Sequence, residues 1–275
     1  VQCFDENQTV EQNTQIPQSV ELFEKYHNAE NGRIRIDFSI HAEYTCKPHI
    51  VRAYSELCKA HGGRMHIHLS ETQREVDECI ARYGKSPVAW FEELGTLDSP
   101  TAAAHCVAVS DEDIAILKRH GVNVIHNPTS NLKLGSGICD YIALAKSTVV
   151  CALGTDGVAS NNNLNMLKEA RLAALLAKGT SHDASAFIAP DALWSAYRSG
   201  YIKKDMCADL ALYPADDINM IPNGDIATAM LYSSDGVAAM TMINGRIVYE
   251  NGEYHTIDIE KVRADALQIR NRLNG

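Results

Sequence analysis

The chain has 275 residues, of which 45% are hydrophobic and 22% are charged, and its formal net charge is −10. These values are ordinary for a globular protein of one barrel-sized domain or two smaller ones. The acidic balance argues against nucleic-acid backbones and anionic membrane surfaces as partners, and no apolar stretch approaches the ~20 residues that a membrane span needs.

The eight cysteines form no C-x-x-C pair, and several of them fall within strand or helix patterns. This usage indicates reduced thiols and not a disulfide framework or a thiolate zinc site. The chain begins with neither a signal-peptide pattern nor a transit-peptide pattern. We therefore expect a cytoplasmic protein.

After a helical pattern at residues 19–26, strand patterns alternate with helical patterns along the chain. Each strand is expected to pair in parallel with its neighbours, because βα units build parallel sheets. The helices have start signals such as Ser86-Pro87 and Ser110, which are typical N-cap sequences. The expected strands are 33–40, 65–69, 101–104, 123–125 and 148–153, and the expected helices are 50–58, 72–83, 88–94, 110–121, 140–146 and 164–177.

The pattern changes after about residue 207. Short strands are expected at 208–213, 238–243 and 246–249, and the last two are joined by Asn244-Gly245, a strong hairpin signal. An amphipathic helix at 259–273 closes the chain. We therefore expect three parts: a barrel at 1–206, a small β domain at 207–252 and a C-terminal helix at 253–275.

The strand at 65–69 carries two histidines on one face, because Met65, Ile67 and Leu69 alternate with His66 and His68. Glu71 follows directly after the strand end. A neutral imidazole can bind a metal, and a carboxylate three residues later can move protons beside it. This short pattern alone would also fit a buried polar strand end with two hydrogen-bonded histidines.

Each predicted strand from residue 33 to residue 153 ends in, or is followed closely by, an ionisable residue. These residues are His41, His68 with Glu71, His105, His126 and Asp156. Because a buried charge without a partner is costly, their placement at successive strand ends indicates one shared polar site.

These motifs resemble the amidohydrolase superfamily of metal-dependent hydrolases, and within it the 5-methylthioadenosine/S-adenosylhomocysteine deaminases and their chlorohydrolase-like relatives. The similarity covers roughly residues 20 to 250. It implies an α/β fold, a (β/α)8 TIM-like barrel that is incomplete in this chain, with a small β-sandwich-like domain. The residues that carry it are H-A-E-Y-T at 41–45, H-I-H-L-S-E-T at 66–72, A-H-C at 104–106, N-P-T-S-N-L-K-L at 127–134, L-G-T-D-G at 153–157 and S-N-N-N at 160–163.

The resemblance implies a role for each matching residue. His68 and Asp156 would bind one divalent metal ion, zinc first, with Fe, Mn or Ni as alternatives. Glu71 would shuttle a proton to the purine ring, and His105 would orient the attacking hydroxide. His41 would contact the substrate, as would Glu71 and Asp156. Simpler interpretations remain open, since Asp156 beside glycine is also typical of a turn and His105 and His41 also fit structural histidines.

The implied reaction is deamination of an adenosine-type nucleoside (5-methylthioadenosine, S-adenosylhomocysteine or adenosine) to the inosine analogue and ammonia. The implied partner is therefore a small purine nucleoside, and a homo-oligomer is compatible with the sequence. Alternatives are deamination of another purine, dechlorination of a triazine-like ring, or a metal-free purine-binding homologue without catalysis.

Two features depart from the family pattern. The H-x-H of the family's first strand, which supplies two more metal ligands, is missing from this chain. Relatives also carry a further helical segment where residue 196 here meets residue 197. We expect that this sequence is part of a longer protein, since two ligands rarely hold zinc well.

Overall fold

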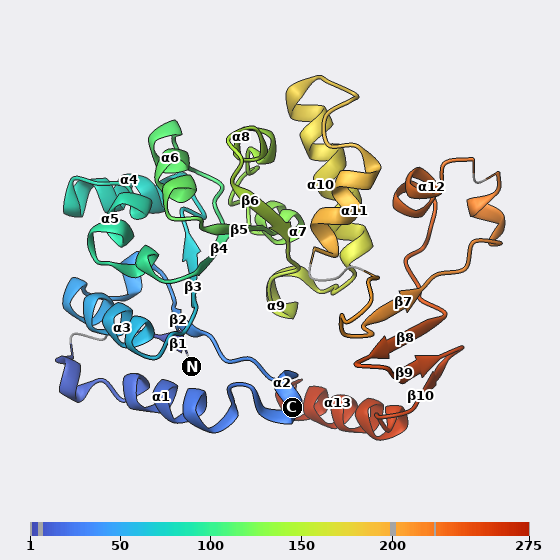
Figure 1. The fold of residues 1–275 in the computed structure, drawn as a ribbon, viewed down its shortest axis with the longest axis horizontal. Helices are drawn as coiled ribbons and strands as arrows, with labels where there is room; N and C mark the ends of the chain where they lie inside the picture. Colours follow the sequence, from blue (N-terminus) through green and yellow to red (C-terminus); the bar gives the residue numbers. More distant parts are fainter. Residues whose placement is uncertain (1, 5–7, 199–201, 223, 275) are drawn as a thin grey trace. The chain divides into compact units, whose positions relative to one another are not determined.

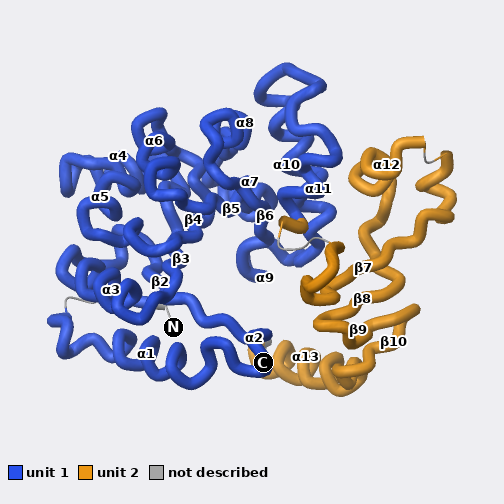
Figure 2. Tube along the Cα trace, in the orientation of Figure 1, with its two compact units in different colours: residues 1–196 blue, residues 197–275 orange. Residues whose placement is uncertain are grey.

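The structure is a computed structural model that describes residues 2–4, 8–198, 202–222 and 224–274. The chain divides into two compact units, residues 1–196 and 197–275 (Figure 2). The expected division into a barrel, a β domain and a separate C-terminal helix stays a prediction.

Unit 1 contains a parallel sheet in which each strand pairs with the next one along the chain. The register places His68 opposite Ala104 and Leu69 opposite His105. This βα order is the one that the alternating pattern predicts. The strands are β1 (Gln2–Cys3), β2 (Phe38–Ile40), β3 (Met65–Leu69), β4 (Thr101–His105), β5 (Asn123–His126) and β6 (Val150–Leu153).

The helices α3, α4, α5, α6 and α8 lie along the same outer side of this sheet (Figure 1). All five lie in the chain between successive strands, as the connections of a parallel sheet require. The helices described in unit 1 are α1 (Gln15–Tyr26), α2 (Ala29–Gly32), α3 (Pro48–Ala60), α4 (Gln73–Tyr83), α5 (Pro87–Glu93), α6 (Asp111–Arg119), α7 (Pro128–Lys133), α8 (Tyr141–Lys146), α9 (Val158–Asn161), α10 (Met166–Ser181) and α11 (Ala189–Ala196).

The two faces of β3 differ as its sequence predicts. Met65, Ile67 and Leu69 are 0% exposed, whereas His66 and His68 are half-buried on the opposite face. The apolar face belongs to the core of unit 1. The other face is left for the imidazoles.

The starts of α5 and α6 are fixed by hydroxyl caps. Ser86 accepts a hydrogen bond from the backbone N–H of Ala89 and is followed by proline at the first helical position of α5. Ser110 accepts from the N–H of Asp113 at the start of α6. Both predicted N-caps are confirmed.

Strand β2 is shorter than the expected span of 33–40. The reason is that residues before it bond to the turn after α1 and not to a neighbouring strand. The backbone N–H of Ile34 donates to Ala29 O, and the N–H of Ile36 donates to the ring of His27.

Unit 2 contains an antiparallel sheet in the order β10-β9-β8-β7. The turn between β8 and β9 is Asn244-Gly245, with φ of 49° and 76°, as a tight hairpin requires. The predicted hairpin and the closing helix are confirmed. The elements described in unit 2 are β7 (Leu210–Leu212), α12 (Ile226–Tyr232), β8 (Met240–Ile243), β9 (Arg246–Glu250), β10 (Glu253–Tyr254) and α13 (Ile259–Asn274).

Among the described residues, none of the helices combines the length and the apolar character that crossing a bilayer requires.

Candidate active site

The carboxyl ends of the parallel strands bring most of the predicted residues to one edge of the sheet. His41 follows β2, Glu71 follows β3, His105 ends β4 and Asp156 follows β6. The backbone leaves the strands through left-handed conformations, which are uncommon outside glycine and collect at functional sites. The non-glycine residues concerned are Ser70 (φ 48°), His105 (φ 76°), Cys106 (φ 46°) and Asp156 (φ 59°).

Three side chains at this edge are close enough to share a metal ion. One ligand atom each from His68, His105 and Asp156 lies within 4.8 Å of the others. His105 is buried, and the other two are half-buried. The structure thus brings together His68 and Asp156, the predicted ligands, and adds a second imidazole to the group.

The ring of His68 is held by the backbone of the neighbouring strand end. Its Nδ1 lies 2.8 Å from the carbonyl oxygen of His41, which also accepts the backbone N–H of His68 at 3.1 Å. Because a carbonyl only accepts, Nδ1 carries the proton and donates it. This hydrogen bond leaves Nε2 as the ring nitrogen of His68 that can bind a metal.

His105 lies between Asn131 and Glu71. Its Nδ1 is 2.8 Å from the side-chain oxygen of Asn131, and its Nε2 is 3.7 Å from Oε2 of Glu71. Its ring stacks on His68 with centroids 5.5 Å apart. The His105 ring therefore lies near the other two side chains of the group, His68 and Asp156, and also near Glu71.

Glu71 has one hydroxyl partner across the site. The hydroxyl of Ser136 donates to Oε1 of Glu71 at 3.0 Å. With His105 near its other oxygen, the carboxylate has a defined position at the strand end. It is half-buried, so it remains accessible to a substrate.

Three donors hold the carboxylate of Asp156. Oδ2 accepts from the hydroxyls of Ser130 at 2.6 Å and Ser160 at 2.8 Å, and Oδ1 accepts from the N–H of Gly157 at 2.7 Å. Burial alone would raise the pKa of Asp156, but these hydrogen bonds and nearby His105 outweigh it, so the pKa lies below its ordinary value. Asp156 is therefore an anion at neutral pH.

His41 lies beside the group. Its ring stacks on Phe4 at 4.7 Å and contacts the ring of His68 at 5.1 Å. Its Nδ1 is 3.0 Å from the hydroxyl of Thr45. Burial, and to a lesser extent His68, lowers the pKa of His41, while Glu71 opposes the shift.

His126 also ends a strand, but it is not one of the three grouped side chains. It is 1% exposed. Burial, with a smaller effect of His105, lowers the pKa of His126 to about 4, so its ring is neutral at physiological pH. His126 is therefore a neutral, buried ring outside the group of three side chains.

The sequence patterns alone did not identify several supporting residues. Ser130, Ser160 and Asn131 hold Asp156 and His105 from segments 26 or fewer residues away. Glu75, on α4, accepts hydrogen bonds from the backbone of the Glu71 loop. Only Glu75 has a clear local signal, since Thr72-x-x-Glu75 matches a capping box.

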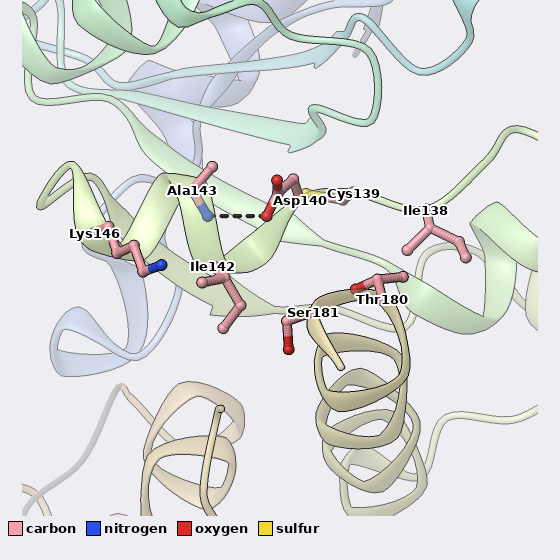
Figure 3. Close-up of a pocket in the computed structure, with 8 residues that line it drawn as sticks. All are labelled: Ile138, Cys139, Asp140, Ile142, Ala143, Lys146, Thr180 and Ser181. Atoms are coloured by element: carbon pink, nitrogen blue, oxygen red, sulfur yellow. Dashed lines mark hydrogen bonds between the residues drawn. The ribbon is translucent and has the colours of Figure 1, made fainter. Parts of the chain in front are cut away.

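A cavity of about 450 Å³ lies elsewhere, between α8 and the end of α10 (Figure 3). The Asp140 carboxylate in its wall accepts the N–H of Ala143 at 2.9 Å and so caps α8. None of the grouped side chains lines this cavity, so it is separate from the candidate active site. Its lining residues are Ile138, Cys139, Asp140, Ile142, Ala143, Lys146, Thr180 and Ser181.

Residues 3–248 match the model of the amidohydrolase family. Two bacterial relatives named 5-methylthioadenosine/S-adenosylhomocysteine deaminase are similar in sequence. The protein of Thermoanaerobacter pseudethanolicus is 40% identical over 253 residues, covering 88% of this chain and 59% of the relative. That of Acetivibrio thermocellus is 42% identical over 265 residues, covering 92% and 62%. The chain thus spans less than two thirds of these relatives.

Solved structures give the same picture of the fold. An adenosine deaminase from Xanthomonas campestris with bound zinc superposes with a TM-score of 0.89 at 30% identity, covering 94% of this chain and 61% of that one. The atrazine chlorohydrolase of Arthrobacter aurescens, complexed with zinc, superposes with a TM-score of 0.86 at 24% identity, covering 92% and 59%. The predicted amidohydrolase barrel fold is therefore confirmed.

Proposed function

The chain belongs to the amidohydrolase family, and from that premise we propose that it contributes the active site of a metal-dependent aminohydrolase. The reaction is deamination of an adenosine-type nucleoside to the inosine analogue and ammonia. It is hydrolysis of a carbon–nitrogen bond in a cyclic amidine. One observation carries the proposal: Glu71 lies 3.7 Å from His105, which is grouped within 4.8 Å with His68 and Asp156.

The donor set fits a divalent metal. His68 offers Nε2, because its other ring nitrogen donates to a carbonyl, and Asp156 offers an anionic oxygen. Nitrogen and oxygen donors of this kind suit zinc first, with Fe, Mn or Ni as alternatives. A bound divalent metal would supply Lewis acidity that makes hydroxide available from water at neutral pH.

The protein side chains account for the proton transfers. Deamination of adenine needs a nucleophile at C6 and a proton at N1. Glu71 delivers a proton to N1, and Asp156 accepts the proton of the attacking water and passes it to the amino group that leaves as ammonia. Glu71 then takes the hydroxyl proton of the tetrahedral intermediate, which helps ammonia leave, forms the C6 carbonyl and restores the protonated Glu71. His105 orients the nucleophile, because its ring is fixed between Asn131 and Glu71. His41 binds the nucleoside from beside this group.

The names of the relatives support the substrate class. Two bacterial relatives at about 40% identity are named for 5-methylthioadenosine and S-adenosylhomocysteine, and adenosine is the third substrate in this class. None of the eight cysteines, all of which lie among the described residues, forms a disulfide, and this is consistent with a cytoplasmic location. Homo-oligomerisation is compatible with this proposal but not required by it.

An assay of ammonia release tests the proposal. The metal-loaded protein that contains this chain is given adenosine, 5-methylthioadenosine, S-adenosylhomocysteine, guanine and a chlorotriazine. We expect ammonia from one or more of the three adenosine-type substrates. Ammonia from guanine alone, chloride from the triazine alone, or binding of purines without turnover would each replace the proposal with one of its alternatives.

A further inference from the structure

Glu75 makes an unusual pair of contacts next to the candidate active site. Its Oε1 accepts the backbone N–H of Ser70 at 3.1 Å, and its Oε2 accepts the backbone N–H of Glu71 at 2.7 Å. The residue is only 6% exposed. One buried carboxylate therefore uses both oxygens on two consecutive amides of the loop that carries Glu71.

The geometry differs from that of an ordinary helix cap. In a capping box, the third residue of the helix bonds the N–H of the capping residue itself. Here Thr72 caps α4 by accepting the N–H of Glu75 at 3.1 Å, but Glu75 reaches further back, to Ser70 and Glu71. The side chain of Glu75 thereby holds the backbone of Ser70, which has a left-handed conformation with a φ of 48°.

Burying this carboxyl group has a cost. Burial raises the pKa of Glu75 to about 7, against the opposing effect of the hydrogen bonds from Glu71 and Ser70, and the nearby carboxylates of Glu43 and Glu71 add to the increase. An apolar residue at this position would avoid that cost. Only a carboxylate offers two acceptor oxygens for the hydrogen bonds from the two backbone N–H groups.

We propose that Glu75 is a positioning residue for proton transfer by Glu71. It fixes the backbone of residues 70 and 71, so that the Glu71 carboxylate stays between Ser136 and His105, where it can reach the substrate. Glu75 does not touch the substrate and acts only through Glu71. This inference rests on the proposed function, because it assigns Glu71 the proton transfer.

The test is a double-mutant cycle in the metal-loaded protein. Glu75→Gln keeps the size of the side chain but replaces one acceptor oxygen with an N–H₂ group that faces an N–H. We expect kcat to fall ~10- to 100-fold, because a small displacement of a catalytic group has an effect of this order. KM and metal content should stay within about twofold of the original. Glu78→Gln, on the exposed side of the same helix, is the matched control and should leave kcat unchanged.

The cycle separates positioning from general stabilisation. In a Glu71→Gln background, Glu75→Gln should lower kcat no further, because the group that it positions is already disabled. Additive losses, or a kcat equal to that of Glu78→Gln, would overturn the proposal. If Glu75→Gln does not fold, Glu75→Asp is used with the same expectations, since it keeps the charge and shortens the side chain.

A second readout does not depend on activity. Amide hydrogen exchange at residue 70 or residue 71 should become faster in Glu75→Gln than in Glu78→Gln, because one of the two backbone N–H groups loses its acceptor oxygen. Unchanged exchange would overturn the proposed contact. If the wild-type protein releases no ammonia while exchange responds as expected, the proposed function fails and the backbone contact is confirmed separately.

Discussion

The two sheets of the molecule differ in burial and in what their ends carry. In the parallel sheet, alternate residues of β3 are 0% exposed, and the strand ends carry His41, Glu71, His105 and Asp156. In the antiparallel sheet, the described residues of β8 and β9 are half-buried or exposed. Its tight turns are Asn244-Gly245 and Asn251-Gly252, which favour chain reversal.

The difference indicates that the buried parallel sheet is the part of the molecule that can hold catalytic side chains in fixed positions. A buried sheet fixes the backbone from which polar side chains start, and each of these side chains then receives its own hydrogen-bond partners. Asp156 accepts hydrogen bonds from three donors, and His68 is held by a carbonyl. Substitutions at the strand ends of the parallel sheet should therefore affect activity far more than substitutions in the antiparallel sheet.

The largest effect is expected for His68→Ala. Removing the imidazole eliminates a proposed ligand, so bound metal and ammonia release should be lost together. Metal analysis and turnover on the same sample check this. His66→Ala is the matched control, because His66 lies on the same face of β3 but outside the group of three. Full metal content and activity in His68→Ala would contradict the ligand assignment.

Glu71→Gln should separate proton transfer from metal binding. The amide keeps the size and most hydrogen bonding of the side chain but cannot shuttle a proton. We expect turnover to fall ~10²- to 10⁴-fold with metal content unchanged, as for other general acid–base groups. Loss of the metal in this variant would mean that Glu71 is a ligand and not a proton carrier.

His41→Ala should have a smaller and more selective effect. An imidazole that bonds a buried substrate group contributes roughly 1–3 kcal/mol, so kcat/KM for adenosine-type substrates should fall ~10- to 100-fold. Metal content should stay the same. If the bond of His41 to Thr45 is only structural, thermal stability will fall while kcat/KM remains unchanged.

The raised pKa of Glu75 should appear in the pH dependence of the protein's stability. Its pKa is raised from 4.5 to about 7 in the folded protein, so the folded state binds more protons than the unfolded state between these values. Its contribution to stability is therefore fully present below pH 4.5 and is lost as the pH rises through about 7. Thermal unfolding should show this decline in the wild type and a smaller decline in Glu75→Gln. Parallel curves would contradict it.

The smallest effect is expected in the antiparallel sheet. Asn244→Ala places a residue with a Cβ and no local polar group at a φ of 49°. This should lower the free energy of unfolding by roughly 1 kcal/mol. Metal content and kcat/KM should stay at wild-type values. A large loss of activity would remove the contrast between the two sheets.

Much of the site could be predicted from the sequence, because strand ends are local features. The alternation in β3 and the position of Glu71 after it follow from a period of two. The βα order then brings His105 and Asp156 to the same edge of the sheet. The roles of these residues came from the resemblance and stay predictions.

The supporting contacts could not be predicted, because they depend on tertiary geometry. Asn131 meets His105 from a different βα unit, and nothing in the spacing indicates that the carbonyl of His41 accepts from His68. The late start of β2 within the expected strand span of 33–40 has the same origin. Its first residues find partners in the turn after α1, which periodicity does not reveal.

The most direct test of the proposed activity is chelation and metal restoration. Ammonia release from 5-methylthioadenosine, S-adenosylhomocysteine and adenosine is measured with the wild-type protein as purified, after removal of divalent metal, and after addition of zinc. We predict that activity on the preferred nucleoside disappears with the metal and returns with zinc. A metal-free protein that stays fully active, or a zinc-loaded protein that deaminates none of the three, would contradict the account.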